Sequence, residues 1–392
     1  MNRSRRSFLA TGLALPAVAS ATRSEQAPQT PVRPPSPAKA LSSGPELRYK
    51  VLGKTGLKVT TVGFGCMVTS DGSVVERAAD LGITYFDTAR NYQSGNNERM
   101  VGAALKRKRK DITLATKSAA KTKEEALQEL DTSLKTLGTD HVDIWFLHGK
   151  NSPAEVTDDL IEAQQAAKKA GKIRFAGVST HNGQKELLPF LARNPDIDVI
   201  LTAYNFTMEP FMDGVIEEAA KAGKGIVAMK VMAGGARRLQ LGDPNLKRLQ
   251  ADGGMLAALK WVLRNPNVGT TIPSMTDMEQ LDQNLKATAN PFGAGDQKIL
   301  TAQLERIAPL YCRMCGECGG TCRQGLPVAD ILRFLTYADG YGQFALGREN
   351  FLRLPRQQAA VKCGDCRGCT VECPYGVKVS ERLIRAQEMF AC

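Results

Sequence analysis

Residues 112–137 read ITLATKSAAKTKEEALQELDTSLKTL, a short β-rich run followed by an amphipathic stretch. The run Ile112–Ser118 predicts a strand, and Lys123–Leu137 predicts a helix. This alternation occurs eight times between Val59 and about Ala289, with further helical stretches such as Ala154–Ala170 and Met255–Arg264. The predicted strands are Val59–Cys66, Tyr85–Ala89, Ile112–Ser118, Val142–Gly149, Ile173–Thr180, Val199–Asn205, Gly225–Met232 and Val268–Met275.

Eight successive β-α units favour a parallel barrel ringed by helices, the (β/α)8 or TIM-barrel fold of the α/β class. An open doubly wound sheet is the alternative, and a glycine-rich turn after an early strand would favour it. Residues 62–65 read VGFG and lack the third glycine of the dinucleotide-binding fingerprint. We therefore expect a barrel over residues 47–292 and a smaller domain over residues 300–392.

Polar side chains stand at the predicted C-terminal ends of neighbouring strands, where the chemistry of such barrels is located. Asp87, Lys117 and His148 lie at the ends of the second, third and fourth strands, and Tyr92 follows Asp87 in the loop. Each has an ordinary structural explanation alone, such as turn capping or a side chain reaching solvent. Four on one rim are harder to explain in that way, so they form the candidate catalytic group.

The same residues resemble the signature of the aldo-keto reductase family. Residues 86–92 read FDTARNY, and Gly95 and Asn97-Glu98 follow them as in the family's Asp/Tyr motif. Thr116-Lys117 and Leu147-His148 match the two remaining catalytic positions. The resemblance extends over about residues 47–289.

The resemblance implies a specific chemistry for this group. Tyr92 would be the general acid that protonates a carbonyl oxygen as hydride arrives from a nicotinamide cofactor, NADP or NAD. Lys117 would lower the pKa of Tyr92, and Asp87 would hold Lys117 in place. His148 would orient the carbonyl or relay a proton. A small carbonyl or alcohol, with a sugar as one candidate, is the expected substrate.

The cofactor positions match the family less completely. Thr180 stands where the family usually has Asn, and Leu201 stands where it usually has Gln. The arginine that often binds the 2′-phosphate is absent, and Asp277 lies in that region, so the choice between NADP and NAD stays open. The positions that do match are Ser179, Ser274, Gln283 and Asn284.

Eight of the ten cysteines form two blocks with the spacing C-x-x-C-x-x-C-x-x-x-C. This is the spacing of bacterial two-cluster ferredoxins, which implies two 4Fe–4S clusters and a ferredoxin-like domain. Two zinc sites of four cysteines each are the main alternative. The first block is Cys312, Cys315, Cys318 and Cys322, and the second is Cys363, Cys366, Cys369 and Cys373.

The ferredoxin pattern also implies how the cysteines are shared. The first three of each block would hold one cluster, and the fourth would reach across to the other. Cys373 would therefore join the first block, and Cys322 the second. Arg323 follows Cys322, whereas Pro374 follows Cys373 as in the ferredoxin pattern.

The N-terminus reads as an export signal. Residues 4–9, SRRSFL, resemble the twin-arginine signal, and a short apolar stretch with small residues ends near residue 21. Residues 22–46 contain six prolines and predict an extended linker. Because the twin-arginine route exports folded proteins, it suits clusters assembled in the cytoplasm. We therefore expect a periplasmic or otherwise exported protein.

Charge and hydropathy exclude some classes of partner. The formal net charge of +12 is concentrated partly in the N-terminal segment, and no aromatic-rich basic module accompanies it. We therefore expect no nucleic-acid partner, and no membrane span after signal removal. The features together resemble an iron–sulfur branch of the aldo-keto reductases. The alternatives are an electron-transfer protein with the barrel as a docking platform for a redox partner, or clusters that only stabilise the tail.

Overall fold

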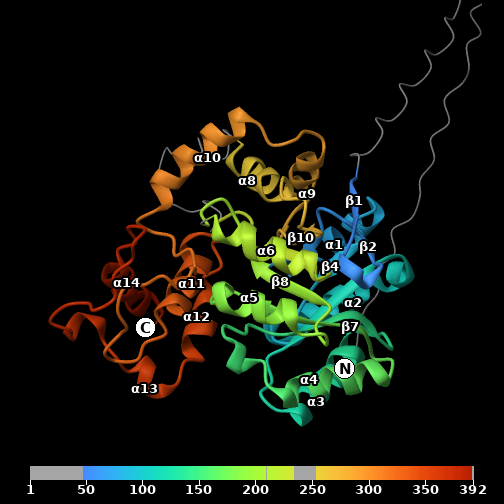
Figure 1. Cartoon of the computed structure of the whole chain (residues 1–392), viewed down its shortest axis with the longest axis horizontal. Helices are drawn as coiled ribbons and strands as arrows, with labels where there is room; N and C mark the ends of the chain where they lie inside the picture. The colour runs from blue at the N-terminus through green and yellow to red at the C-terminus, as the bar shows by residue number, and fades with distance from the viewer. Residues whose placement is uncertain (1–46, 209, 234–252, 391–392) are drawn as a thin grey trace, which may run out of the picture. The chain divides into compact units, whose positions relative to one another are not determined.

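The computed structural model describes residues 47–208, 210–233 and 253–390 (Figure 1). The predicted export signal at 1–21 and the proline-rich segment at 22–46 lie outside the described residues. Among the described helices, none is long and apolar enough to cross a membrane.

Eight parallel strands form the predicted barrel. In the sheet the strands follow one another in the order β10-β9-β8-β7-β6-β5-β4-β3. Parallel bridges between Val62 and Thr271 and between Gly65 and Ser274 close it. The strands are β3 (Phe64–Gly65), β4 (Tyr85–Asp87), β5 (Thr113–Ser118), β6 (Val142–Leu147), β7 (Ile173–Thr180), β8 (Val199–Ala203), β9 (Gly225–Met229) and β10 (Thr270–Thr271).

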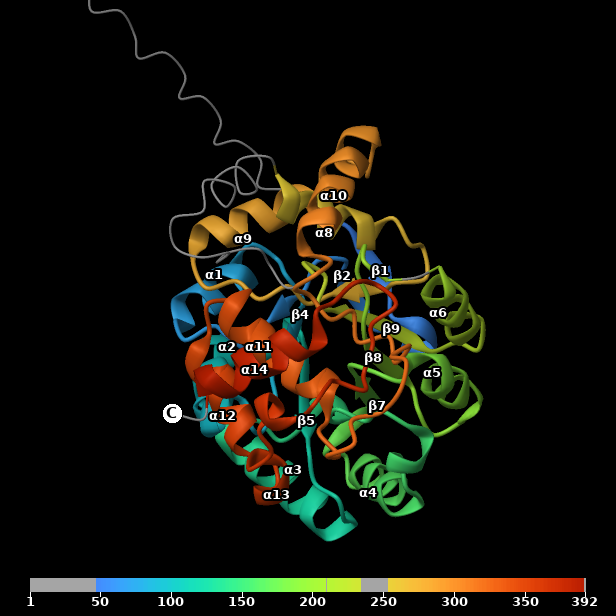
Figure 2. The ribbon, with the colours of Figure 1, turned by 90° about the vertical axis from the view of Figure 1, so that its left-hand side faces the viewer.

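Helices alternate with these strands and surround them (Figure 2). Within the described segments they are α1 (Gly72–Asp80), α2 (Asn96–Leu105), α3 (Lys123–Leu137), α4 (Asp158–Lys169), α5 (Gln184–Arg193), α6 (Phe211–Lys221), α8 (Gly254–Leu263) and α9 (Met278–Leu285). Short 3-10 helices lie between successive strands and helices, namely Gly53–Thr55, Tyr92–Gly95, Lys106–Asp111, Pro153–Glu155 and Lys286–Thr288.

The β5-α3 unit shows how local sequence produces this arrangement. Every residue of β5 is buried, as expected of a parallel strand covered on both faces. Thr122 then caps α3, because its side chain accepts a hydrogen bond from the backbone N–H of Glu125. Gly138 ends the helix in a left-handed conformation, with φ of 68°. The helix predicted over Lys123–Leu137 is confirmed with the same bounds.

The first predicted strand is wrong as a single element. Residues 59–66 divide between β2 (Lys58–Thr60), which pairs antiparallel with β1 (Tyr49–Val51), and β3 of the barrel. The change occurs at Thr61, whose N–H donates to Arg48 O at 2.8 Å in the hairpin. Its carbonyl accepts a hydrogen bond from Thr271 N at 2.9 Å in the barrel. Residues 59–66 therefore contribute to two different sheets. Hydrophobic periodicity alone does not show this division.

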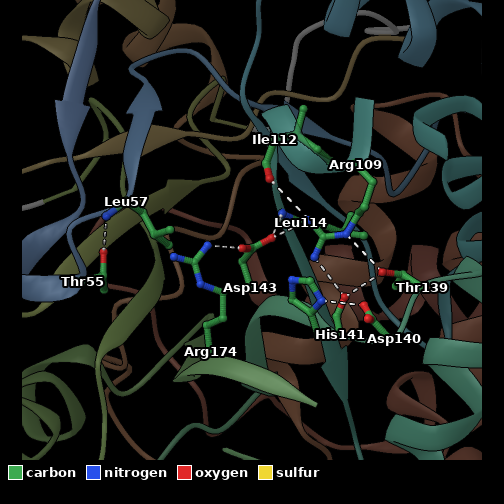
Figure 3. Close-up of polar contacts among 10 residues, drawn as sticks. All are labelled: Thr55, Leu57, Arg109, Ile112, Leu114, Thr139, Asp140, His141, Asp143 and Arg174. Carbon is green, nitrogen blue, oxygen red and sulfur yellow. Dashed lines mark hydrogen bonds and ion pairs between the residues drawn. The ribbon is translucent and has the colours of Figure 1, made fainter. Parts of the chain in front are cut away.

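Near the N-terminal ends of the strands, a buried carboxylate is fully paired (Figure 3). Asp143, the second residue of β6, lies 2.9 Å from Arg109 and 2.6 Å from Arg174. It also accepts a hydrogen bond from the backbone N–H of Leu114 at 2.9 Å. Each oxygen of this carboxylate has a cationic partner, so the pairing offsets the cost of burying the charge.

The tail after the barrel is mainly helical in its described part. Its helices are α10 (Ala294–Ile307), α11 (Val328–Asp339), α12 (Phe344–Leu352), α13 (Arg356–Ala359) and α14 (Val379–Phe390), with a 3-10 turn at Cys363–Asp365. α10 packs against α8, and α11 packs against α12 and α14. Only an isolated bridge between Gly319 and Glu372 joins extended segments in the described tail. The predicted ferredoxin-like domain is therefore not confirmed by this topology.

Candidate active site

The structure brings the predicted catalytic group together at the C-terminal ends of β4, β5 and β6. The ammonium of Lys117 forms an ion pair with Asp87 and donates to Thr88 O at 2.7 Å. The same ammonium lies 3.4 Å from the Tyr92 hydroxyl and 4.9 Å from the centre of its ring. The His148 ring meets the Tyr92 ring edge-on, with centroids 5.8 Å apart. The side chains of Asp87, Tyr92, Lys117 and His148 therefore lie together at the mouth of the barrel.

A second set of buried contacts holds the loop that carries Tyr92. Thr116 donates to Glu98 at 2.7 Å, and Arg90 forms an ion pair with the same carboxylate. Asn97 accepts a hydrogen bond from Thr88 at 2.7 Å and donates to Cys66 O at 2.8 Å. These contacts join the loop to β5 and to the end of β3, so the position of Tyr92 depends on the start of α2.

The expected direction of the Tyr92 pKa is wrong. Burial raises the pKa of Tyr92 well above its ordinary value, and the negative charge of Asp87 adds to the rise. Because Asp87 is paired with Lys117, the positive charge available to stabilise a phenolate is largely offset. Tyr92 is therefore a neutral proton donor at physiological pH.

His148 is likewise neutral near pH 7. Burial lowers the pKa of His148 well below its ordinary value. The positive charges of Lys117, Arg333 and Lys230 lower it further. A neutral imidazole can donate one hydrogen bond and accept another, which suits a group that orients a carbonyl oxygen.

A cavity of about 140 Å³ opens beside Tyr92 and Asp87. Its wall comes from the loops after β3, β9 and β10, and also from Tyr341 and Gln343 of the tail. The tail therefore contributes to the same cavity as the catalytic group.

The predicted cofactor residues lie in different environments. Ser274 lines the cavity, whereas the buried Ser179 accepts a hydrogen bond from Gly149 N at 2.9 Å. Asn284 is buried in α9, and Gln283 is exposed and donates to Glu279 at 2.9 Å. Only Ser274 of these four reaches the described cavity wall.

Thr180, the last residue of β7, and His181, which follows it, lie in different environments. Thr180, at the position where the family usually has Asn, donates to Asn182 O at 2.6 Å. His181 lines the cavity instead, and its buried Nδ1 atom has no hydrogen-bond partner among the described residues. The Nδ1 atom of His181 is therefore available for a hydrogen bond to a ligand.

The residues that the sequence did not reveal come from β9 and the tail. Lys230 directly follows β9, and its ammonium lies 3.3 Å from the hydroxyl of Tyr337 in α11. Arg333, one turn earlier in α11, donates to the same hydroxyl at 2.9 Å. Figures 1 and 2 both show α11 beside the strand ends of the barrel. Lys230 lies near the C-terminal end of the predicted strand Gly225–Met232, which was a usable signal, but nothing local marks Arg333 or Tyr337.

The two cysteine blocks lie against each other in the tail. Gly319, after the third cysteine of the first block, exchanges two backbone hydrogen bonds of 2.9 Å with Glu372. Thr370, after the third cysteine of the second block, donates to Thr321 O at 2.7 Å. Thr321 and Glu372 each precede the fourth cysteine of their block. This reciprocal pairing brings the end of each block beside the middle of the other.

The thiols fall into two neighbourhoods. Burial raises the pKa of Cys363 to about 11, and the nearby thiols of Cys322, Cys366 and Cys369 add to the rise. These four also line one cavity of about 490 Å³. Within the described residues, however, no group of three or more His, Cys, Asp or Glu side chains lies close enough to hold a metal ion.

The first block shows the same crosswise grouping. Burial raises the pKa of Cys312 to about 12, and the thiols of Cys318, Cys315 and Cys373 contribute to this rise. In each block the pKa of one thiol therefore responds to two cysteines of the same block and to the fourth cysteine of the other block. We call each such set of four thiols a quartet.

Comparison with known proteins identifies the barrel. The sequence profile of the Aldo/keto reductase family matches residues 69–305. Uncharacterized oxidoreductase YqkF of Bacillus subtilis is 26% identical over 310 residues, 68% of this chain and 98% of that protein. L-galactose dehydrogenase of Arabidopsis thaliana is 27% identical over 304 residues, 67% of this chain and 94% of that protein.

A solved structure gives the same result. Aldo-keto reductase AKR11C1 from Bacillus halodurans, in its holo form, is similar with a TM-score of 0.56 and 26% identity. The match covers 66% of this chain and 96% of that chain. The family match includes Asp87, Tyr92, Lys117 and His148 and stops before Cys312. The chain therefore belongs to the aldo/keto reductase family and is an NAD(P)-dependent oxidoreductase.

Proposed function

We propose that this protein reduces a carbonyl group to an alcohol with hydride from a nicotinamide dinucleotide. The observation that carries the proposal is the meeting of Tyr92, Lys117 and His148 at one point of the barrel mouth. A bound nicotinamide supplies the hydride, and Tyr92 supplies the proton to the developing alkoxide. Burial raises the pKa of Tyr92, so its hydroxyl stays protonated near pH 7 and can act as the proton donor.

The cavity has the groups that a nicotinamide ring needs. Met229 and Ile272 offer apolar surface to a ring face. Ser274 and the Nδ1 of His181, which no described residue contacts by a hydrogen bond, offer polar partners to a carboxamide. His148 orients the carbonyl oxygen beside Tyr92, and Asp87 keeps the ammonium of Lys117 in place.

Replacing the proton donor tests this function directly. Tyr92→Phe removes the hydroxyl and keeps the ring, so kcat/KM for carbonyl reduction should fall about 100- to 10,000-fold. Tyr49→Phe is the matched control, because Tyr49 is exposed in the β1-β2 hairpin. Unchanged turnover in Tyr92→Phe, or no dinucleotide binding by the wild type, would refute the proposal.

We further propose that the two cysteine quartets hold two 4Fe–4S clusters. Cross-pairing of the blocks supports this, because a two-cluster arrangement needs the fourth cysteine of each block beside the other. Gly320 supports it as well, since a Cβ there would lie 2.2 Å from Thr370 O. The close approach of the blocks therefore depends on a glycine. Ligation draws the thiolates of a quartet onto a common centre and contributes to folding of the tail.

Metal analysis of anaerobically purified protein separates this proposal from zinc. Two clusters predict about eight iron atoms and eight sulfides per chain, whereas two zinc sites predict about two zinc atoms and no sulfide. Cys369→Ser should remove about half of the iron. Loss of tail folding without loss of turnover would indicate a stabilising role for the clusters. Clusters that are reduced and reoxidised during turnover would indicate electron transfer.

Electron transfer to a redox partner is the second candidate function. The first block lies on the barrel side, since Tyr311, next to Cys312, accepts a hydrogen bond from Asn205 at 3.4 Å after β8. The second block is more exposed, with both Cys366 and Cys369 exposed. One cluster near the cavity and one near the surface would suit a route between the two. Cluster potentials outside the range of every tested partner would argue against it.

Export through the twin-arginine route completes the proposal. The motif at residues 4–9 supports it, and folded export suits a chain with clusters assembled before transport. Replacing both Arg5 and Arg6 with lysine should retain the protein in the cytoplasm, as measured by cell fractionation. Equal periplasmic recovery of both forms would exclude this route.

A further inference from the structure

Two cations converge on one phenol at the mouth of the barrel, outside the catalytic group. The ammonium of Lys230 lies 3.3 Å from the Tyr337 hydroxyl, and Arg333 donates to that hydroxyl at 2.9 Å. Lys230 also lies over the rings of Tyr337 and Tyr341, at 4.5 and 5.5 Å from their centres. These partners of Lys230 are aromatic and carry no formal negative charge in their neutral forms.

Among the residues that the structure describes, the positive charge in this cluster exceeds the negative charge of its partners. Arg333 has an ion pair with Asp330 at 2.8 Å, but its buried Nε atom has no hydrogen-bond partner in the described part of the chain. Lys230 lines the catalytic cavity, so its charge is available there. Excess buried cation next to a cavity favours a ligand that brings a negative charge.

The backbone at Lys230 is held in an uncommon conformation. Its φ of 58° lies in the left-handed region, which non-glycine residues rarely adopt. The side-chain amide of Asn205 donates to Lys230 O at 3.1 Å. Strain of this kind occurs mainly at functional sites, where the surrounding structure maintains it.

The cluster acts on the catalytic group at a distance. The charges of Arg333 and Lys230 lower the pKa of His148, and the charge of Arg333 lowers that of Tyr92. An anion bound at Lys230 would therefore lie in the same cavity as the carbonyl that Tyr92 protonates.

We propose that Lys230 binds an anionic group, a carboxylate or a phosphate, carried by the carbonyl substrate, with Tyr337 and Arg333 positioning its ammonium and adding positive charge. This names the substrate class and rests on the proposed carbonyl reduction. The pyrophosphate of the dinucleotide has the same chemistry and is the other source of an anion, so the experiment separates the two.

The first experiment compares charged and neutral forms of one carbonyl compound. Phenylglyoxylate and its methyl ester form one pair, and glyceraldehyde 3-phosphate and glyceraldehyde form the other. Lys230→Met should raise KM for the preferred anion about 10- to 100-fold, because a charge-assisted hydrogen bond is lost. KM for the neutral partner and the Kd of the dinucleotide should change less than about twofold.

A matched control replaces a lysine at the same end of the barrel. Lys121 is exposed in the loop after β5, so Lys121→Met removes one charge without touching the cavity. It should leave both kinetic constants unchanged. Two results together would overturn the proposal: Lys230→Met weakens dinucleotide binding as much as it raises KM, and its effect on KM is the same for the acid and the ester. The anion at Lys230 would then belong to the cofactor.

The second experiment does not depend on turnover. Burial would raise the pKa of Tyr337, but the charges of Arg333 and Lys230 lower it to about 8. A bound phenylglyoxylate or inorganic phosphate should offset those charges and raise this pKa, as followed by tyrosinate absorbance. Tyr337→Phe should lack the transition, which assigns the signal.

The two experiments separate the two proposals. An anion-dependent shift of the Tyr337 transition without any carbonyl turnover would support the anion site and refute the proposed function. Turnover of neutral carbonyls that depends on Tyr92, with no shift and no preference for anions, would refute the anion site alone.

Discussion

Buried charge is paired at the N-terminal end of the barrel, whereas positive charge is in excess among the described residues at the C-terminal end. At the N-terminal end, the Asp143 carboxylate has Arg109, Arg174 and a backbone N–H as partners (Figure 3). At the C-terminal end, Lys230 and Arg333 meet at the hydroxyl of a tyrosine. Each oxygen of the Asp143 carboxylate has a cationic partner. Among the described residues, the cluster of Lys230 and Arg333 carries more positive charge than its partners balance.

The difference follows the division of labour in such barrels. The N-terminal face contributes stability, and the C-terminal face carries the loops that bind and react. A paired carboxylate has no capacity left for a ligand, whereas two cations around a neutral phenol do. Mutations at the two ends should therefore affect different quantities, stability in one case and binding in the other.

Removing the carboxylate at the N-terminal end should have the largest effect on stability. Asp143→Ala leaves two guanidinium groups near each other without their anion, one of them largely buried. The free energy of unfolding should fall by about 3 kcal/mol. Urea denaturation measures this change, and the kcat of the folded fraction should stay near the wild-type value. A fall below about 1 kcal/mol would show that the cluster is not a stabilising unit.

The pH dependence of stability tests the charge excess at the other end. The folded-state pKa of Tyr337, about 8, lies below the ordinary value near 10 because its phenolate is stabilised. Its contribution is present above the unfolded pKa and is lost as pH falls through the folded pKa. The stability difference between wild type and Tyr337→Phe should grow by about 2 kcal/mol from pH 8 to pH 10. A flat difference would mean that the two cations do not act on this phenol.

Removing a cation at the mouth should change stability little. Lys230→Met removes a charge whose pKa is lowered by burial, so the released desolvation cost offsets the lost hydrogen bond. We expect a change within about 1 kcal/mol in either direction, measured by urea denaturation at pH 7. A loss as large as that of Asp143→Ala would show that Lys230 stabilises the fold as strongly as the paired carboxylate does.

Breaking an exposed ion pair should have the smallest effect on stability. Lys172 and Asp131 form an ion pair of 2.5 Å, but their side chains are 36% and 55% exposed. Lys172→Met should change the free energy of unfolding by less than about 0.5 kcal/mol. A thermal shift larger than that of Lys230→Met would show that exposure does not govern these charge effects.

Local pattern predicted much of the fold and of the site. The β-rich runs and helical stretches that gave eight units are local features, and β7 and α3 have the predicted bounds. Asp87 and Tyr92 are five residues apart on one strand and its loop, so their proximity is also local. Lys117 and His148 could be added because consecutive parallel strands end at the same face.

Other features depend on contacts that local pattern does not encode. Residues 59–66 divide between two sheets because Thr61 bonds to both the hairpin and the barrel. Thr180 and His181 differ in role because only one of them faces the cavity. The pKa of Tyr92 rises because its surroundings bury it, which reverses the direction expected from Lys117.

The sequence by itself predicted the barrel, the four candidate catalytic positions and the two equally spaced cysteine blocks, since these features are visible in short-range periodicity, local motifs or repeated spacing. Only the tertiary structure placed Tyr337 of α11 against Lys230 of the barrel mouth, across 107 residues of chain. Such a contact depends on how the tail packs against the barrel, because α11 buries an apolar face of its own and carries Arg333 and Tyr337 with it. The physical reason is that charge balance in a cavity is a property of all the segments that line it.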